Sequence, residues 1–243
     1  MRSAVDMTIR RFFVDAVARE TALTGEEYAH AKNVLRLGIG DEVVLLDGSG
    51  KEYDAVICRA EKGALFCNVV GERPGEKEPQ TRVKLLAGAL KGDKTELIVQ
   101  KATELGVTEI GIFLSRFSSA YMNENKLERL KKVAREAAKQ CLRSRVPEIV
   151  FYANLSSALA SCGGYVNRLF ACEFAEKSDA DLAALHGSCA LVVGSEGGFS
   201  EEEFAMAQDS GFAGITLGRR ILRAETAAIA LTAVVMFALG ELR

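Results

Sequence analysis

A glycine-rich loop lies between a predicted strand and a predicted helix in the last quarter of the chain. It reads Val-Gly-Ser-Glu-Gly-Gly-Phe-Ser over residues 193–200, and Ser200 with Glu203 forms a capping box that would start the helix. Three glycines within residues 194–198 let a ligand approach the backbone closely. In open α/β sheets, ligands bind at the carboxyl ends of strands. The loop is therefore a candidate ligand site, with a plain turn as the alternative.

The charges of this loop argue against phosphate as the ligand. A phosphate loop supplies lysine and free N–H groups at a helix N-terminus, whereas this loop supplies Glu196 and three more glutamates at 201–203. Those carboxylates already occupy the positive end of the helix dipole. A neutral or cationic ligand held by main-chain groups fits better, and the sulfonium of S-adenosylmethionine is such a cation.

A second loop, rich in arginine, enters the apolar helix at the end of the chain. It reads Leu-Gly-Arg-Arg-Ile-Leu-Arg-Ala-Glu-Thr over residues 217–226 and follows another predicted strand. Charged side chains beside a buried element are costly unless they are paired or used. Arg223 and Glu225 could simply pair or cap the helix. Alternatively, both loops follow consecutive strands and could line one pocket.

The elements that must position these loops alternate between strands and helices. Strands are predicted at 83–90, 109–114, 148–152, 168–171, 190–193 and 214–217, and long helices at 93–106, 126–145 and 200–211. This alternation is typical of a mainly parallel sheet covered on both faces, an α/β fold. The apolar run Thr226–Leu239 holds 14 residues, fewer than the roughly 20 needed to span a bilayer, and predicts a buried helix.

The first part of the chain follows a different pattern. The stretch 71–80 holds two of the three prolines and predicts a boundary between domains at 1–72 and 80–243. Before it, a capping box at Thr24 and Glu27 predicts a helix to Leu37, and runs at 42–46, 53–59 and 64–70 predict a β-meander. A small barrel or sheet with one helix is expected.

Composition narrows the class of protein. The six cysteines include no C-x-x-C pair and there are only two histidines, so no metal site is expected. No signal-peptide pattern is present, which favours a cytoplasmic protein with reduced cysteines and no membrane anchor. The net charge of −2 conceals a basic segment, 82–147, with 14 Lys and Arg against 7 Asp and Glu. That segment could attract a phosphate backbone or form a solvated helix face with acidic neighbours.

Five motifs together resemble the family of 16S ribosomal RNA uridine-N3 methyltransferases, which belongs to the knotted SPOUT class. They are V-L-R-L-G-I-G-D at 34–41, K-A-T-E-L-G-V at 101–107, R-x-R-V-P-E-I at 143–149, G-S-E-G-G-F-S at 194–200 and L-G-R-R-I-L-R-A-E-T-A at 217–227. The resemblance covers almost the whole chain in the same order. It implies an N-terminal PUA-like β-barrel that binds RNA and a C-terminal α/β domain with a trefoil knot. It also implies a homodimer, S-adenosylmethionine as cofactor, and 16S ribosomal RNA or the small ribosomal subunit as substrate.

The resemblance also implies site residues. Those that would bind the cofactor are Gly194, Ser195, Glu196, Gly197, Gly198, Leu217, Gly218, Ile221, Leu222, Arg223, Ala224 and Thr226. Arg223 would stabilise negative charge on the uracil, and Glu225 would orient it or accept its proton, although a hydroxide-assisted route needs no protein base. Ser195 departs from the family pattern, which has proline there, and Lys139 and the segment Ser-Arg-Phe-Ser at 115–118 depart as well.

Several basic residues are candidates for docking RNA through its phosphates. They are Arg10 and Arg11 before the first barrel strand, Arg36 on the barrel helix, and Lys91 and Lys94 at the first strand-helix turn of the second domain. The basic residues of 131–145 could extend this track or form a solvated surface. The alternative functions are a knotted methyltransferase with another target nucleotide and a non-catalytic RNA-binding homologue. A nucleotide-binding oxidoreductase lacks support because no full G-x-G-x-x-G is present.

Overall fold

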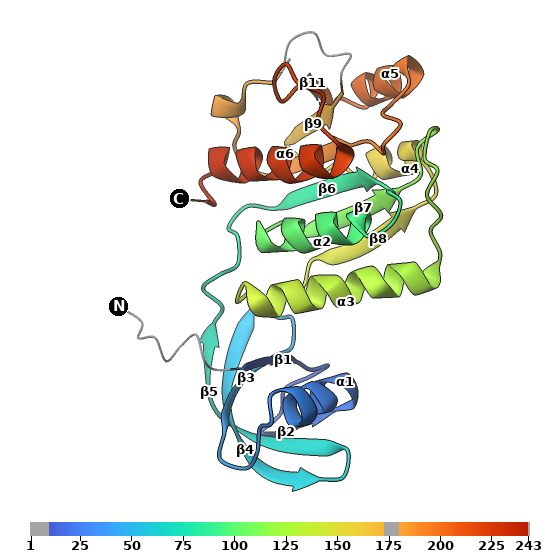
Figure 1. Cartoon of the computed structure of the whole chain (residues 1–243). Coiled ribbons are helices and arrows are strands. Elements are labelled where there is room, and N and C mark those ends of the chain that lie inside the picture. The colour runs from blue at the N-terminus through green and yellow to red at the C-terminus, as the bar shows by residue number, and fades with distance from the viewer. Residues whose placement is uncertain (1–9, 173–179, 243) are drawn as a thin grey trace. The chain divides into compact units, whose positions relative to one another are not determined.

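The computed structural model describes residues 10–172 and 180–242 (Figure 1). The chain divides into two compact units. One contains the described residues up to Glu78 together with Ala138–Val146, and the other contains Pro79–Ala137 and the described residues from Pro147 onward. Ala138–Val146 comes from the middle of the chain but belongs to the first unit. Local sequence patterns could not predict this assignment.

The first unit is a five-stranded sheet in the order β1-β3-β4-β5-β2, with β1 parallel to β3 and the other neighbours antiparallel. Its strands are β1 Arg10–Phe13, β2 Glu20–Thr24, β3 Glu42–Leu46, β4 Lys51–Glu61 and β5 Ala64–Pro74. The predicted meander is confirmed in β3, β4 and β5. Phe12, Leu23, Leu45, Ile57 and Leu65 are fully buried and form its core.

The helix of this unit differs from the prediction. It begins as α1, Gly25–Ala29, and continues as a π-helix, η2, over His30–Val34. Thr24 makes no side-chain cap bond. The expected capping partner, Glu27, instead forms an ion pair of 2.7 Å with Lys139, far away in the sequence. The predicted capping box is therefore wrong, because a distant partner takes the carboxylate.

The second unit is a six-stranded parallel sheet in the order β11-β9-β10-β6-β7-β8. Its strands are β6 Val83–Gly88, β7 Glu109–Phe113, β8 Glu148–Tyr152, β9 Asn167–Ala171, β10 Cys189–Val193 and β11 Ala213–Ile215. All six predicted strands are confirmed, with ends shifted only slightly. The apolar runs predict these strands well because both faces of the sheet are covered.

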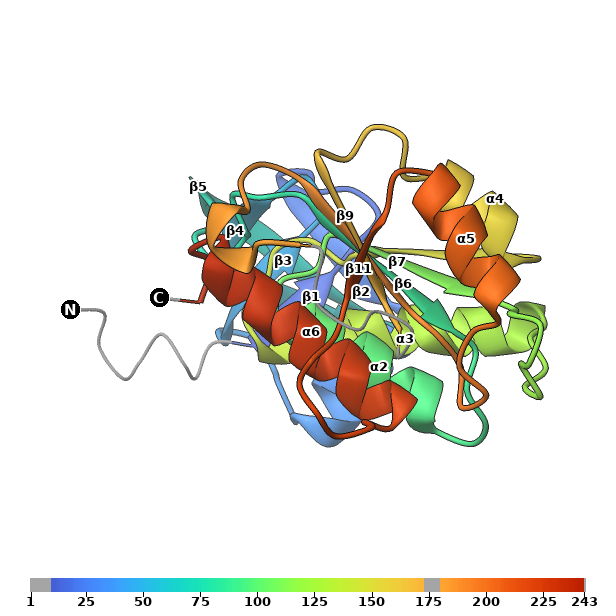
Figure 2. The same ribbon diagram turned by 90° about the horizontal axis from the view of Figure 1, so that it is seen from above.

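Helices cover both faces of this sheet, as predicted. They are α2 Lys94–Glu104, α3 Glu124–Gln140, α4 Leu155–Ala160, α5 Glu201–Asp209, α6 Ala224–Ala238 and a short 3-10 helix, η3, at Leu182–Ala184. Figure 2 shows α2 beside α6 on one side of the strands and α4 beside α5 on the other. The capping box of Ser200 and Glu203 at the start of α5 is confirmed.

Two helix predictions need correction. The helix predicted over 126–145 ends at Gln140, and Leu142 then adopts a left-handed backbone with φ 65°, so the chain leaves the helix well before Pro147. The C-terminal helix α6 is buried on one face only. Leu231 and Val235 are fully buried, whereas Phe237 is 59% exposed. Among the described helices, none is both long and apolar enough to cross a membrane.

The C-terminal segment returns to the centre of the second unit. Strand β10 lies in the middle of the sheet, and β11 then adds to the edge beside β9. Helix α6 packs back over β10, β6 and α2. This return course is consistent with the expected trefoil knot, and it carries the loops that follow β10 and β11 to the same end of the sheet. An aromatic contact supports the first of these loops, since the ring centroids of Phe170 on β9 and Phe199 lie 4.2 Å apart.

Candidate active site

The two loops line a single pocket of about 660 Å³ in the second unit. Residues 193–199 after β10 form one wall, and residues 215–225 after β11 form another. The lining is completed by Lys94 from the start of α2, by Ala171 and Cys172 at the end of β9, and by Ala227 on α6. The pocket thus lies at the carboxyl ends of the parallel strands, where α/β sheets bind ligands.

Nearly all the residues proposed to bind the cofactor line this pocket. They are Gly194, Ser195, Glu196, Gly197, Gly198, Leu217, Gly218, Ile221, Leu222, Arg223 and Ala224. The proposed catalytic Glu225 also lines it. Thr226 does not, and its side chain is exposed on the first turn of α6. Sequence reasoning missed Cys172, although β9 pairs with β10 and must end beside the same loop.

The first loop packs its backbone directly against the end of β6. A methyl group added at Gly88 would lie 2.5 Å from the backbone nitrogen of Ser195, so only glycine allows this approach. The loop then closes on itself through a hydrogen bond of 3.0 Å from the Gly198 N–H to the Ser195 carbonyl. Gly198 adopts φ 66°, a left-handed conformation that favours glycine. The loop is therefore a tightly supported turn in the wall of the pocket.

The loop after β7 supports the first loop from another side. The hydroxyl oxygens of Ser115 and Ser195 lie 3.1 Å apart, and both residues are buried. The Arg116 N–H donates to the Glu203 carboxylate at 3.0 Å, beyond the hydrogen bonds of the capping box. Ser195 thus makes a side-chain contact that proline, the residue of the family pattern, could not make.

Glu196 and Glu225 give the pocket two carboxylates around one lysine. The Lys94 ammonium lies 3.4 Å from Glu196 and 3.9 Å from Glu225. Burial alone would raise the pKa of Glu196, but hydrogen bonds from its own N–H, the Lys91 N–H and Lys94 lower that pKa below its ordinary value. One carboxylate oxygen of Glu225, Oε2, is buried and has no hydrogen-bond partner among the described residues. A buried carboxylate oxygen without a partner can accept a hydrogen bond from a cationic ligand group.

The arginines of the second loop are not paired with its glutamate. Arg219, Arg220 and Arg223 line the pocket and are exposed, and within the described parts of the chain their side chains have no ion pair or hydrogen bond. Arg223 is the N-cap residue of α6, where only its backbone carbonyl is engaged. The alternative that Arg223 and Glu225 simply pair is therefore excluded. The three guanidinium groups are available to bind a substrate.

The candidates for RNA docking in the first unit differ in accessibility. Arg10 and Arg11 belong to β1 and do not precede it. Arg10 is exposed, but the Arg11 side chain is 9% exposed and forms an ion pair with buried Glu52, which also binds Arg73 at 2.8 Å. Arg36 is exposed but follows η2 with φ 57° and does not lie on the helix. Arg10 and Arg36 are thus the accessible members of this set.

The candidates in the second unit also divide. Lys91 is exposed in the turn after β6, whereas Lys94 is engaged with the two pocket glutamates. Some basic side chains of segment 82–147 are already paired with acidic ones. Arg129 forms an ion pair of 2.8 Å with Glu96. Lys131 likewise binds Glu128 at 2.7 Å.

Among the described residues, no three His, Cys, Asp or Glu side chains are grouped so that they could hold a metal ion.

The lowered pKa of Glu196 predicts a pH-dependent contribution to folding. Its interactions stabilise the fold above the pKa of the unfolded chain, and the contribution disappears as the pH falls through the lower folded pKa. We expect Glu196→Gln to reduce the free energy of unfolding at pH 7 by up to about 1 kcal/mol, and to have little effect near pH 3. Urea unfolding at the two pH values would measure this, with exposed Glu201→Gln as the matched control. An equal loss at both pH values would contradict the assignment.

Family models match both parts of the chain. Residues 76–236 match a model described as an RNA methyltransferase domain, and residues 23–70 match one described as an RNA methyltransferase PUA domain. The first match covers more than half of the chain and includes both pocket loops. The predicted α/β SPOUT-type fold with a PUA-like N-terminal part is thereby confirmed.

Relatives and solved structures agree with this assignment. Ribosomal RNA small subunit methyltransferase E of Bacillus subtilis is 30% identical over 90% of this chain and 93% of that protein. The protein of the same name from Mycobacterium bovis is 32% identical over 94% of this chain and 92% of that protein. The Neisseria gonorrhoeae enzyme, solved bound to S-adenosyl methionine, is 27% identical with a TM-score of 0.88 over 95% of this chain and 98% of that chain. A Legionella pneumophila structure with bound SAM gives a TM-score of 0.86 at 27% identity over 95% and 98% of the two chains.

The sequence motifs, the fold and the full-length similarity to these relatives therefore lead to one conclusion: this chain belongs to the RNA methyltransferase family of ribosomal RNA small subunit methyltransferase E.

Proposed function

We propose that this protein transfers the methyl group of S-adenosylmethionine to N3 of a uridine in 16S ribosomal RNA. The observation that carries the proposal is the single pocket in which the loops after β10 and β11 meet. Two structural relatives were solved with this cofactor, and the relatives in sequence are named for the ribosomal RNA of the small subunit. The motif resemblance indicates uridine as the target nucleotide and N3 as the methylated atom.

The residues of the pocket fit this cofactor. A pocket of about 660 Å³ lies within the range of small-molecule sites, roughly 300–1,000 Å³. The glycines of 194–198 leave main-chain N–H and C=O groups that can bind an adenine ring. Glu225 Oε2, buried without a hydrogen-bond partner among the described residues, can accept a bond from a cationic group of the ligand. When bound, the cofactor supplies an electrophilic methyl group.

The protein's own side chains would prepare the uracil. N3 must lose its proton, and the negative charge then spreads onto O2 and O4. Arg223, whose guanidinium makes no ion pair or hydrogen bond with the described residues, would stabilise that charge. Glu225, beside Lys94, would orient the base or accept its proton, unless hydroxide removes it. The uridine must be unpaired to reach the pocket.

RNA docking would use exposed cations outside the pocket. Arg10, Arg36 and Lys91 are exposed and suited to phosphate contacts, which position a strand without reading its sequence. Arg11 and Lys94 are already engaged with carboxylates, so they would contribute less. A substrate within the small ribosomal subunit would place the protein in the cytoplasm.

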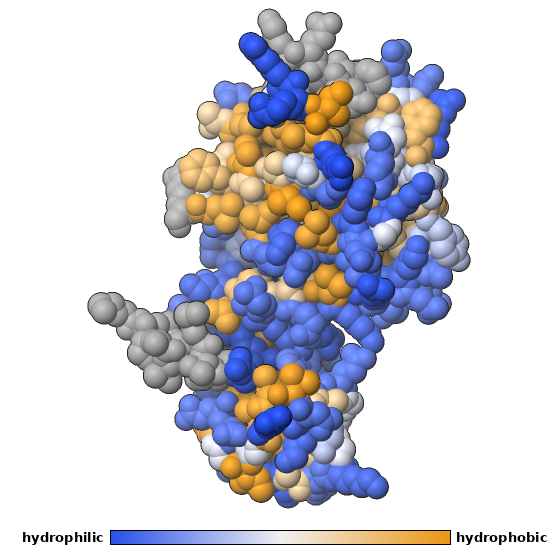
Figure 3. All heavy atoms as spheres, in the orientation of Figure 1, coloured by the Kyte–Doolittle hydropathy of each residue, from blue (hydrophilic) through white to orange (hydrophobic). Residues whose placement is uncertain are grey.

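The exposed face of α6 would form the contact of a homodimer. Val234 and Phe237 are exposed on this helix, and Figure 3 shows apolar residues gathered over α6 and α2. Exposed apolar patches of this kind mark interaction sites. A twofold dimer would bury the same patch from both copies.

Replacing Arg223 tests the proposed reaction. We expect Arg223→Ala to lower the rate of methyl transfer on the order of 100-fold, as expected for the loss of one donor that stabilises developing charge. Arg223→Lys should lose less, because it keeps the positive charge. The measurement is transfer of labelled methyl groups to small-subunit RNA by variants shown to be folded by circular dichroism. Full activity of Arg223→Ala would mean that the site is wrongly assigned.

Nucleoside analysis of the methylated RNA identifies the target atom. The product should be 3-methyluridine. Another methylated nucleoside would mean that a member of the same family acts on a different target. Cofactor binding without any methylated product would favour the non-catalytic alternative.

A charge on the exposed face of α6 tests the dimer. We expect Phe237→Glu to convert a dimer into a monomer in light scattering, because the glutamate would be buried without a partner in the contact. Ile39→Glu, at an exposed apolar residue of the first unit, is the matched control and should not change the mass. An unchanged mass for Phe237→Glu would exclude this helix face as the contact.

A further inference from the structure

An aromatic side chain lies exposed beside the cofactor loop. Phe117 follows β7, and it is 47% exposed. A methyl group added at Gly197 would lie 2.5 Å from the Phe117 Cβ, so the two residues are in direct contact. Gly197 lines the pocket but Phe117 does not. The aromatic ring therefore belongs to the outer side of the loop and not to the cavity itself.

The segment that carries Phe117 is firmly attached to the cofactor loop. Ser115, two residues before it, contacts the Ser195 hydroxyl at 3.1 Å, and the Ser118 hydroxyl accepts from the Ser115 N–H at 3.1 Å. The Arg116 N–H donates to Glu203 at the start of α5. Hydrogen bonds on both sides of Phe117 thus fix its backbone relative to the pocket. A platform that positions a base needs this kind of support.

The surroundings of Phe117 fit a nucleic-acid base better than an apolar partner. The Arg116 guanidinium lies 5.9 Å from the Phe117 ring centroid and 3.3 Å from Glu202, so the ring is exposed among charged groups. A flat base with polar edges can stack on the ring and keep those edges in water. Unpaired RNA bases are commonly stacked on Phe, Tyr or Trp next to arginine.

We propose that Phe117 is a positioning residue that stacks on an unpaired RNA base next to the target uridine, outside the pocket, while the target itself enters the pocket. The inference rests on the proposed function, and it adds the side chain that holds the neighbouring base when the target leaves its stack. The loop after β7 then has two roles. Its serines and its backbone support the cofactor loop, and its aromatic ring binds the substrate.

Replacing the ring while keeping an apolar side chain tests this role. We expect Phe117→Leu to raise the KM for small-subunit RNA or lower kcat/KM by roughly 10-fold or more, within the effect of losing one stacked base. Phe117→Trp should stay within a few-fold of the natural protein because it restores stacking. The dissociation constant for S-adenosylmethionine, measured by calorimetry, should remain the same in all three proteins.

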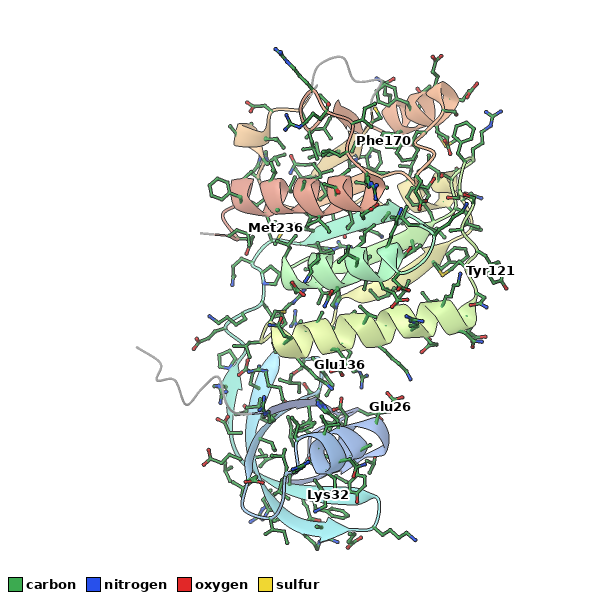
Figure 4. All side chains as sticks on the ribbon, viewed as in Figure 1. Glu26, Lys32, Tyr121, Glu136, Phe170 and Met236 are labelled. Carbon is green, nitrogen blue, oxygen red and sulfur yellow. The ribbon has the colours of Figure 1, made fainter. Side chains whose placement is uncertain are left out.

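Tyr121 offers a matched control from the same loop. Tyr121, labelled in Figure 4, is 66% exposed. The Lys126 ammonium lies 5.4 Å from the centroid of its ring. Tyr121 lies just before α3. We expect Tyr121→Leu to leave the kinetics with RNA unchanged.

Three results would overturn the inference. Unchanged RNA kinetics in Phe117→Leu would show that no base stacks there, and weakened cofactor binding would show that the ring only supports the loop. A changed oligomeric mass would assign Phe117 to a subunit contact. If the natural protein binds the cofactor but methylates no RNA, the proposed function fails as well, whereas an active natural protein with an unaffected Phe117→Leu variant removes this inference alone.

Discussion

The site depends on the close packing of one loop backbone against the end of a central strand. Gly194 and Ser195 lie against Gly88 of β6, where a methyl group would come within 2.5 Å of the Ser195 nitrogen. From the other side, the loop after β7 holds it through Ser115 and through Phe117. Because both supports come from neighbouring parallel strands, the sheet itself sets the shape of the loop. The loop can then present main-chain groups to a ligand without further ordering, which reduces the cost of binding.

Charge is divided within the pocket in a way that suits methyl transfer. Glu196 and Glu225 share Lys94, which leaves a buried carboxylate oxygen of Glu225 without a partner among the described residues. Arg223 stands at the N-cap of the adjoining helix with its guanidinium unpaired in the described structure. Carboxylates favour a cationic donor, and an unpaired guanidinium favours an acceptor that becomes negative. The same two loops therefore meet the opposite electrostatic needs of the two reactants.

Sequence patterns correctly predicted the elements that depend on residues close together in the chain. The apolar runs identified all six strands of the parallel sheet, and the capping box of Ser200 and Glu203 identified the start of α5. The failures came from distant partners. Glu27 pairs with Lys139 and Arg11 with Glu52, so neither side chain does what its neighbours in the sequence indicate. The exposed face of α6 was missed because an all-apolar helix shows no polar side. The order of the strands, with β10 in the middle of the sheet and β11 at its edge, also lies outside local patterns.

The claim that the two loops form one cofactor site is tested most directly by titrating S-adenosylmethionine into the purified protein in a calorimeter. The structure predicts one site for each chain, and a folded Gly88→Ala variant should bind more weakly because the added methyl group displaces Ser195. No heat of binding at millimolar cofactor, or equal affinity in the variant, would contradict the account of how this pocket is built.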